Sequence, residues 1–157
     1  MIEIRCDKKW CPLVRRHKLE KILEIFLKNL FKNEHGLSVY ITDDAKIKKL
    51  NMEFFGKNSP TDILSWSYSE NGNDFILPII DDSREKEIAG DLMVSAERVI
   101  DQAIENGWNF EKELIRLLAH GCAHLAGWDH ERSLDEAQKM LELEISLLKK
   151  VGLSNIY

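Results

Sequence analysis

Three of the five histidines in this 157-residue chain fall within eleven positions, as His120, His124 and His130. Residues four apart on an α-helix differ by about 400° around its axis, so His120 and His124 would project from one face, a single turn apart. Gly127 can end that helix in a conformation that a larger residue would resist, and the next turn can return His130 to the same point. Structural zinc usually takes four protein ligands, so three imidazoles predict a catalytic ion with a position open to water.

The same histidine spacing occurs in metzincin peptidases, in which a glutamate follows the first histidine and acts as the general base. Gly121 stands at that position here. A peptidase of that type needs the carboxylate beside the metal, so the glycine argues against proteolysis unless a carboxylate from elsewhere in the chain reaches the ion. A glycine inside a helix also costs about 1 kcal/mol relative to alanine. We therefore expect substrate or a neighbouring backbone to occupy the space beside Gly121.

Hydrophobic periodicity predicts the elements that must position these histidines. Alternating apolar residues indicate strands at residues 2–6, 37–42, 63–68 and 89–95. Helical spacing indicates a helix after Pro12 that closes at Gly36, followed by helices at about 44–54, 96–106 and 110–126. Asp43 or Asp44 would cap the helix at 44–54, and Asn109 would cap the helix at 110–126. A last helix starts at the cap Ser133, and its expected apolar face is Leu134, Ala137, Leu141, Ile145 and Leu148. The segment 75–87 has no clear pattern and could be a loop carrying a small strand.

These elements predict an α+β fold with a small, mostly parallel four-stranded sheet covered by helices, in which one strand could be reversed. We expect residues 1–157 to form a single domain with a metal-bearing helix, because neither a repeat nor a linker interrupts the sequence. The order of the strands does not follow from the sequence.

The composition limits the class of protein and its partners. Hydrophobic residues make up 44% of the chain, no apolar run approaches the 18 residues of a membrane span, and the first residues do not resemble a signal peptide, so we expect a cytoplasmic protein without a membrane partner. The net charge of −5 opposes binding to nucleic acid, so we expect no DNA partner, and RNA would need a local basic patch. The basic residues that could form one are Lys46, Lys48, Lys49 and Lys57, and also Arg15, Arg16 and Lys18.

Three cysteines, Cys6, Cys11 and Cys122, form no disulfide framework and are interpreted as structural or incidental thiols.

The histidine segment, His120-Gly-Cys-Ala-His124-Leu-Ala-Gly127-Trp-Asp-His130, resembles the signature of the bacterial YbeY metallo-endoribonucleases. The resemblance extends from about Val39 to Leu148 and includes Leu50-Asn51, the segment 60–66, Gly90-Asp91-Leu92, Met140 and Glu144. It implies a zinc-dependent nuclease for single-stranded RNA whose ligands are the three histidines, although nickel or another divalent transition metal would also bind. It further implies maturation of the 3′ end of 16S ribosomal RNA, a role in ribosome quality control, and partners among the small-subunit proteins.

One departure from the family bears on catalysis. The family has an arginine where this chain has Phe55, and a phenylalanine cannot stabilise charge on a phosphate. We hypothesise that Lys57 or Arg5 supplies a weaker substitute, although Lys57 could equally be an ordinary loop lysine and Phe55 could pack in the core or stack on a base. The alternative function is a non-catalytic ribosome-assembly factor in which the three-histidine metal site is structural.

Four further polar residues lie near the signature or within the resemblance: Asp129, Asp62, Ser65 and Asp91. Asp129 could orient a metal-bound histidine, because such imidazoles need an acceptor on the other nitrogen. Asp62, Ser65 and Asp91 could line a cleft or dock a ribosomal partner. Turn and capping roles remain open for all four.

Overall fold

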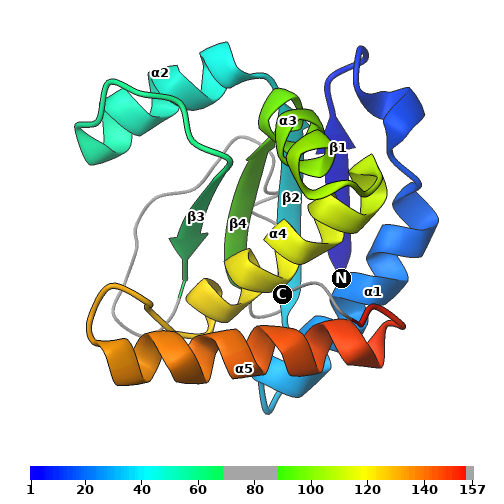
Figure 1. Cartoon of the computed structure of the whole chain (residues 1–157), viewed down its shortest axis with the longest axis vertical. Coiled ribbons are helices and arrows are strands. Elements are labelled where there is room, and N and C mark those ends of the chain that lie inside the picture. The colour runs from blue at the N-terminus through cyan, green and yellow to red at the C-terminus, as the bar shows by residue number, and fades with distance from the viewer. Residues whose placement is uncertain (69–87, 155–157) are drawn as a thin grey trace.

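A computed structural model of the chain describes residues 1–68 and 88–154, and its centre is one four-stranded sheet (Figure 1). The strands are β1 (Ile2–Cys6), β2 (Gly36–Thr42), β3 (Ile63–Ser67) and β4 (Ile88–Ser95), and they lie in the order β1-β2-β4-β3. β1, β2 and β4 are parallel, whereas β3 runs antiparallel to β4. The predicted mostly parallel sheet with one reversed strand is confirmed. The segment 75–87 lies outside the described residues.

Five α-helices and one short 3-10 helix accompany the sheet in the described part of the chain. They are η1 (Cys11–Leu13), α1 (Arg16–Leu30), α2 (Asp44–Phe55), α3 (Ala96–Asn106), α4 (Phe110–Leu125) and α5 (Leu134–Lys150). The helix expected to close at Gly36 ends at Leu30, because Phe31 turns extended and Gly36 already opens β2. The side chains of Asp43, Asn109 and Ser133 accept the backbone N–H bonds expected of helix caps. Within the described ranges, no helix has the length and apolar character required to cross a bilayer.

The two faces of the sheet pack against different helices, as the alternation along β4 requires. Leu92 and Val94 belong to a large core built with α1, α3, α4 and α5, whereas Met93 belongs to a smaller one with α2. Each fully buried aliphatic side chain of this kind contributes about 1.5–3 kcal/mol to folding. α4 is therefore fixed against β3 and β4, and the sheet determines where its histidines lie.

Gly121 lies where α4 comes closest to the sheet. A Cβ at this position would be 2.8 Å from Ile63 Cδ1 and 2.9 Å from Leu92 Cδ2, both too close for ordinary carbon contacts. The prediction that substrate or backbone fills this space is therefore wrong, because side chains of β3 and β4 fill it. The absence of a Cβ lets the helix approach the strands.

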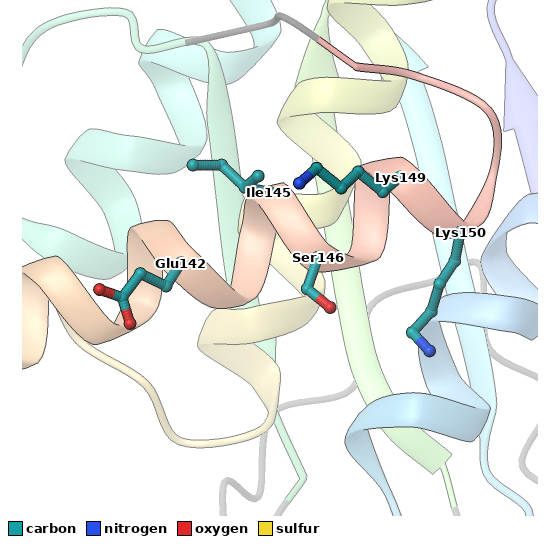
Figure 2. Close-up of a pocket in the computed structure, with 5 residues that line it drawn as sticks. All are labelled: Glu142, Ile145, Ser146, Lys149 and Lys150. Carbon is teal, nitrogen blue, oxygen red and sulfur yellow. The ribbon is translucent and has the colours of Figure 1, made fainter.

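The predicted apolar face of α5 is only partly correct. Leu134 is 92% exposed, whereas the side chains buried from this helix are Met140, Glu144, Leu147 and Leu148. Ile145 instead lines a shallow surface depression of about 380 Å³, together with Glu142, Ser146, Lys149 and Lys150 (Figure 2). The helix is rotated relative to the prediction because the side that carries the acidic Glu144 faces α4.

Candidate metal centre

The C-terminal end of α4 is built as a tight helix stop. Gly127 has a φ of +99°, and its N–H donates to the His124 carbonyl at 3.0 Å while Trp128 N–H donates to the Ala123 carbonyl at 3.1 Å. This pair of bonds is the Schellman arrangement, in which a left-handed residue satisfies the last carbonyls of a helix. The chain turns back immediately afterwards, as the sequence predicted from Gly127, and brings His130 beside α4.

The three histidines converge at this turn. One ligand atom from each of His120, His124 and His130 lies within 4.8 Å of the other two, and the Nε2 atoms of His120 and His124 are 3.1 Å apart. Two imidazole nitrogens bound tetrahedrally to zinc at about 2.05 Å would be roughly 3.3 Å apart, so the spacing of the His120 and His124 nitrogens fits such an ion. Among the described residues, no cysteine, carboxylate or further histidine joins this set. The donor set therefore fits one transition metal with a position open to solvent.

Glu144 fixes the orientation of the first histidine. Its carboxylate on α5 is 4% exposed and lies 2.5 Å from His120 Nδ1. A carboxylate can only accept at this contact when ionised, so Nδ1 carries the proton and Nε2 keeps its lone pair toward His124. Carboxylate–histidine–metal triads use this arrangement to set the tautomer and raise the basicity of the ligand.

The environment of His124 also favours the form that binds metal. Burial is the main influence that lowers the pKa of His124, and the neighbouring His120 and His130 lower it further. Metal ions bind the neutral imidazole, so a depressed pKa keeps this ligand available at a lower pH than an ordinary histidine. Burial and the two neighbouring histidines thus favour the neutral, metal-binding form of His124.

The histidines form one end of a cleft of about 650 Å³ between α4, β3 and the C-terminal end of α2. Figure 1 shows the end of α4 lying between β3 and α5, with the loop to α5 alongside. One wall of the cleft is formed by α2 and the loop after it, through Asn51, Ser59, Pro60 and Thr61. The cleft is open and large enough for a segment of an extended polymer at the metal position.

Phe55 and Lys57 both line this cleft, whereas Arg5 does not. Arg5 lies on β1, at the edge of the sheet opposite β3, so the hypothesis that it replaces the family arginine is wrong. The Phe55 ring packs at 5.8 Å from the Trp66 ring and remains 47% exposed. Lys57 is exposed, and no ion-pair partner for it lies within the described residues.

Two of the predicted polar residues, Asp62 and Ser65, lie in the cleft wall on and beside β3. Asp62 accepts from the Ile63 backbone N–H at 2.8 Å and from Gln102 Nε2 at 3.2 Å, which ties the start of β3 to α3. Its carboxylate is thereby held in place rather than free to move. Ser65 stands on the α4 side of β3 and lines the cleft together with His120.

Asp129 lines the cleft beside the third histidine, but its carboxylate holds the turn together. The backbone N–H of Glu131 donates to Asp129 Oδ1 at 2.9 Å, and this bond is the main reason that the pKa of Asp129 lies below its ordinary value. Arg132, 3.6 Å away, acts in the same direction. The carboxylate that contacts a histidine directly is that of Glu144.

Asp91 lies outside the cleft. It is fully buried on β4, where the hydroxyl of Tyr68 donates to its carboxylate. Asp91 pairs across the sheet with Ser38 and Trp66, on strands that flank β4. The structure thus brings Asp62, Ser65 and Asp129 to the histidines and leaves Asp91 inside the sheet.

Several residues of the predicted basic patches bond to other side chains of the same chain. Arg15 donates twice to Glu111 at 2.6 and 2.7 Å, and Lys18 also bonds to Glu111. Lys46 donates to the Tyr40 hydroxyl at 2.9 Å. The lysines of α2 that face solvent, Lys48 and Lys49, remain as the basic surface nearest to Lys57 in sequence.

Sequence reasoning from the residues alone missed the part played by Glu144. The signal was a single acidic residue on the side of a helix that also carries Met140, Leu147 and Leu148. A carboxylate on a buried face requires a hydrogen-bonding partner, and a histidine on the facing helix is the simplest one. The family pattern contained Met140 and Glu144 without indicating which side chain they meet.

Comparison with known proteins gives a consistent result. The family model described as Endoribonuclease YbeY matches residues 5–152. A protein named Endoribonuclease YbeY from Aquifex aeolicus is 39% identical over 139 residues, covering 88% of this chain and 85% of that protein. One of the same name from Symbiobacterium thermophilum is 42% identical over 142 residues, with 90% and 86% covered. The solution structure of TM1509 from Thermotoga maritima superposes with a TM-score of 0.62 at 28% identity, covering 96% of this chain and 89% of that one.

Proposed function

The chain belongs to the YbeY family of endoribonucleases, and on that premise we propose that it is a metal-dependent endoribonuclease that hydrolyses phosphodiester bonds in RNA. The observation that carries the proposal is the convergence of three histidines at one end of an open cleft. A bound divalent ion there would supply Lewis-acid polarisation of a phosphodiester and activation of water.

Zinc is the ion we propose, with one ion per chain and nickel or another divalent transition metal as the alternative. Three neutral imidazoles without a thiolate suit zinc, and the open position is typical of its catalytic sites. His120, His124 and His130 would hold the ion. Glu144 would keep the His120 ring oriented and its proton on Nδ1.

The proposed substrate is a single-stranded region of RNA, and the specific one is the 3′ end of 16S ribosomal RNA, processed in the cytoplasm during small-subunit maturation and quality control. The names of the relatives support an RNA substrate, and the resemblance supports the ribosomal assignment and partners among small-subunit proteins. Asp62, Ser65 and Asp129 would contribute to substrate or partner contacts from the cleft wall.

Lys57 is the residue we propose for stabilising charge on the phosphate, because it is the lysine of the cleft wall. A cation that contacts the phosphoryl oxygens acts mainly as their charge rises in the transition state. Lys57→Ala should therefore reduce the rate of cleavage more than it weakens RNA binding. Lys21→Ala, which removes an exposed lysine of α1 outside the cleft lining, is the matched control and should leave the cleavage rate close to that of the wild type.

The test of the proposed function is cleavage of a structured ribosomal RNA fragment by zinc-loaded protein, beside a chelated sample and the variant His124→Ala. The metal content and the circular dichroism spectrum of each sample are measured in parallel. Activity should disappear in both controls while the fold persists. A panel of peptides included in the same experiment should remain uncleaved, because Gly121 stands where a zinc peptidase of this spacing carries its glutamate.

One observation favours the non-catalytic assembly factor as second candidate: Phe55, the residue at which the resemblance implies an arginine, lines the cleft. If the zinc-loaded, folded protein cleaves no RNA, the decisive variant is Phe55→Arg. Cleavage gained by this substitution would identify a metal site that lacks only its phosphate-binding cation. Continued inactivity together with binding to the small subunit would establish the assembly factor.

A further inference from the structure

Two thiols lie side by side at the end of the sheet where β1 finishes. Cys6 is the last residue of β1 and Cys11 is the first of η1, and their Sγ atoms are 2.7 Å apart. Cys11 Sγ also donates to the Cys6 carbonyl at 3.3 Å. A disulfide bond is about 2.05 Å long, so the two sulfur atoms need to approach by less than about 1 Å to become bonded.

The chain between the two cysteines is fixed by contacts with the core and with β2. The carboxylate of Asp7 accepts from the hydroxyls of Tyr40 and Thr42, at 2.5 Å each. The side chain of Trp10 is buried in the core, and the backbone N–H of Trp10 donates to the Asp7 carbonyl at 2.8 Å. The fold itself therefore holds the thiols in contact, and closing the short loop between them requires little further ordering of the chain.

The surroundings of the pair distinguish it from the third cysteine. Both Cys6 and Cys11 are partly exposed, which gives a small oxidant access, and Arg16 Nη2 lies 3.7 Å from Cys6 Sγ, where it favours a thiolate. Burial and the Cys11 thiol nevertheless raise the pKa of Cys6, and Arg16 offsets only part of that rise, so its reaction will be slow. Cys122 is fully buried in the core, and burial raises its pKa to about 12.

We infer that Cys6 and Cys11 form a redox-active dithiol that is converted to an intramolecular disulfide by hydrogen peroxide. In the first step the Cys6 thiolate attacks one peroxide oxygen, an S–O bond forms, the O–O bond breaks, and the departing hydroxide takes a proton to become water. In the second step the Cys11 sulfur attacks the sulfenic sulfur of Cys6, the S–S bond forms, the S–O bond breaks, and the departing hydroxide takes the proton of the Cys11 thiol to become a second water. The two thiols lose two electrons in total, and the peroxide gains them.

This site is independent of the proposed nuclease. β1 forms one edge of the sheet and β3 forms the other, and neither cysteine lines the cleft that contains the histidines. Oxidation of the pair should therefore leave zinc binding unchanged, and it can be tested whether or not the protein cleaves RNA.

The experiment treats the reduced, full-length protein with hydrogen peroxide, removes the excess, and counts thiols after denaturation without reductant. The expected result is a fall from three thiols per chain to one, a mass lower by two hydrogens, and a peptide in which Cys6 is linked to Cys11. Reductant should restore all three thiols. Peroxide-treated Cys122→Ala, which keeps the pair, should have no thiols left.

Several outcomes would overturn the inference. Three thiols after exhaustive treatment would show that the pair does not react. A mass increase by oxygen atoms would show separate oxidation of single cysteines, and disulfide-linked dimers would show that the contact within one chain is not used. The variant Cys11→Ser supplies the complementary control, because it should form no intramolecular disulfide and should accumulate oxygen on Cys6.

Discussion

At the scale of single residues, the proton on His120 is decided by a side chain 24 positions later in the sequence. Glu144 is buried and contacts His120 Nδ1, so it holds the imidazole in the tautomer whose Nε2 faces His124. A buried carboxylate without such a partner would be costly, and the histidine satisfies it. The same contact thus serves the stability of α5 and the readiness of the metal centre.

Replacing Glu144 tests this role directly. Glu144→Gln keeps the shape and removes the charge, so the basicity of His120 should fall and the affinity for zinc should drop by about tenfold, at the lower end of the 10–100-fold range typical of such partners. The measurement is competition with a zinc chelator of known affinity. Glu142→Gln, on the exposed side of the same helix, should retain the wild-type affinity. Equal affinities for all three proteins would show that Glu144 has only a structural role.

The residues of the site differ in how well the sequence reveals them. His120, His124 and His130 could be predicted because helical spacing and a glycine stop are local properties of the chain. Asp129 and Asp62 could be predicted as polar residues near the cleft, and the bond of Asp129 to the Glu131 backbone is the local turn contact that the sequence left open. The bond of Asp62 to Gln102 could not be predicted, because it depends on how β3 and α3 pack, and packing is not encoded at any fixed spacing.

At the scale of elements, the turn that ends α4 brings His130 beside the two histidines of the helix. Gly127 adopts a φ of +99°, and nothing lies within 4 Å of where its Cβ would be. Its requirement is therefore conformational rather than steric. The left-handed residue both ends the helix and directs the chain toward His130.

Gly127→Ala should destabilise the protein by about 1–2 kcal/mol, the usual cost of a left-handed conformation for a residue with a Cβ. Gly107→Ala provides a matched control, because Gly107 ends α3 with a φ of +72° and also has open space around it. Urea unfolding should show similar losses for the two variants. Zinc affinity should fall only for Gly127→Ala, and a fall of the same size for Gly107→Ala would contradict the role of this turn.

The helices and strands were predicted well where the pattern was local, and less well where it depended on a neighbour. The strand positions and the caps Asp43, Asn109 and Ser133 follow from alternation and side-chain chemistry. The buried face of α5 was misassigned because several apolar faces are compatible with its sequence, and Leu134 is exposed. The contact between Glu144 and α4 selects among those faces, and the sequence of α5 alone does not contain that information.

At the scale of the whole molecule, α1 and α4 are joined by an ionic cluster at the start of α4. Glu111 lies in the first turn of α4 and receives two bonds from Arg15 and one from Lys18. These contacts connect the helix that carries the histidines to the helix that follows β1. Arg15 and Lys18 are therefore paired with an acidic side chain of the same chain.

Zinc should stabilise the whole molecule, because the three histidines converge only in the folded chain. A ligand that binds only the folded state at 100 times its dissociation constant adds about 2.7 kcal/mol to the free energy of unfolding. Thermal unfolding with zinc and with chelator should differ accordingly for the wild type. The difference should vanish for His124→Ala, and its persistence would show that the stabilising ion binds elsewhere.

The ionic cluster predicts a specific dependence of stability on pH. The bonds from Arg15 are the main reason that the pKa of Glu111 lies below its ordinary value of 4.5, with burial opposing and Lys18 assisting. A group whose pKa is lower in the folded state stabilises the protein fully above its unfolded pKa and loses that effect as the pH falls through the folded pKa. Glu111→Gln should therefore lower the free energy of unfolding at pH 7, and the difference from the wild type should shrink below about pH 4.5 and in 1 M salt.

Urea unfolding across pH measures this difference, with Glu105→Gln on the exposed face of α3 as the control of equal charge change. A difference that stays constant down to pH 2 would show that Glu111 acts through packing rather than charge.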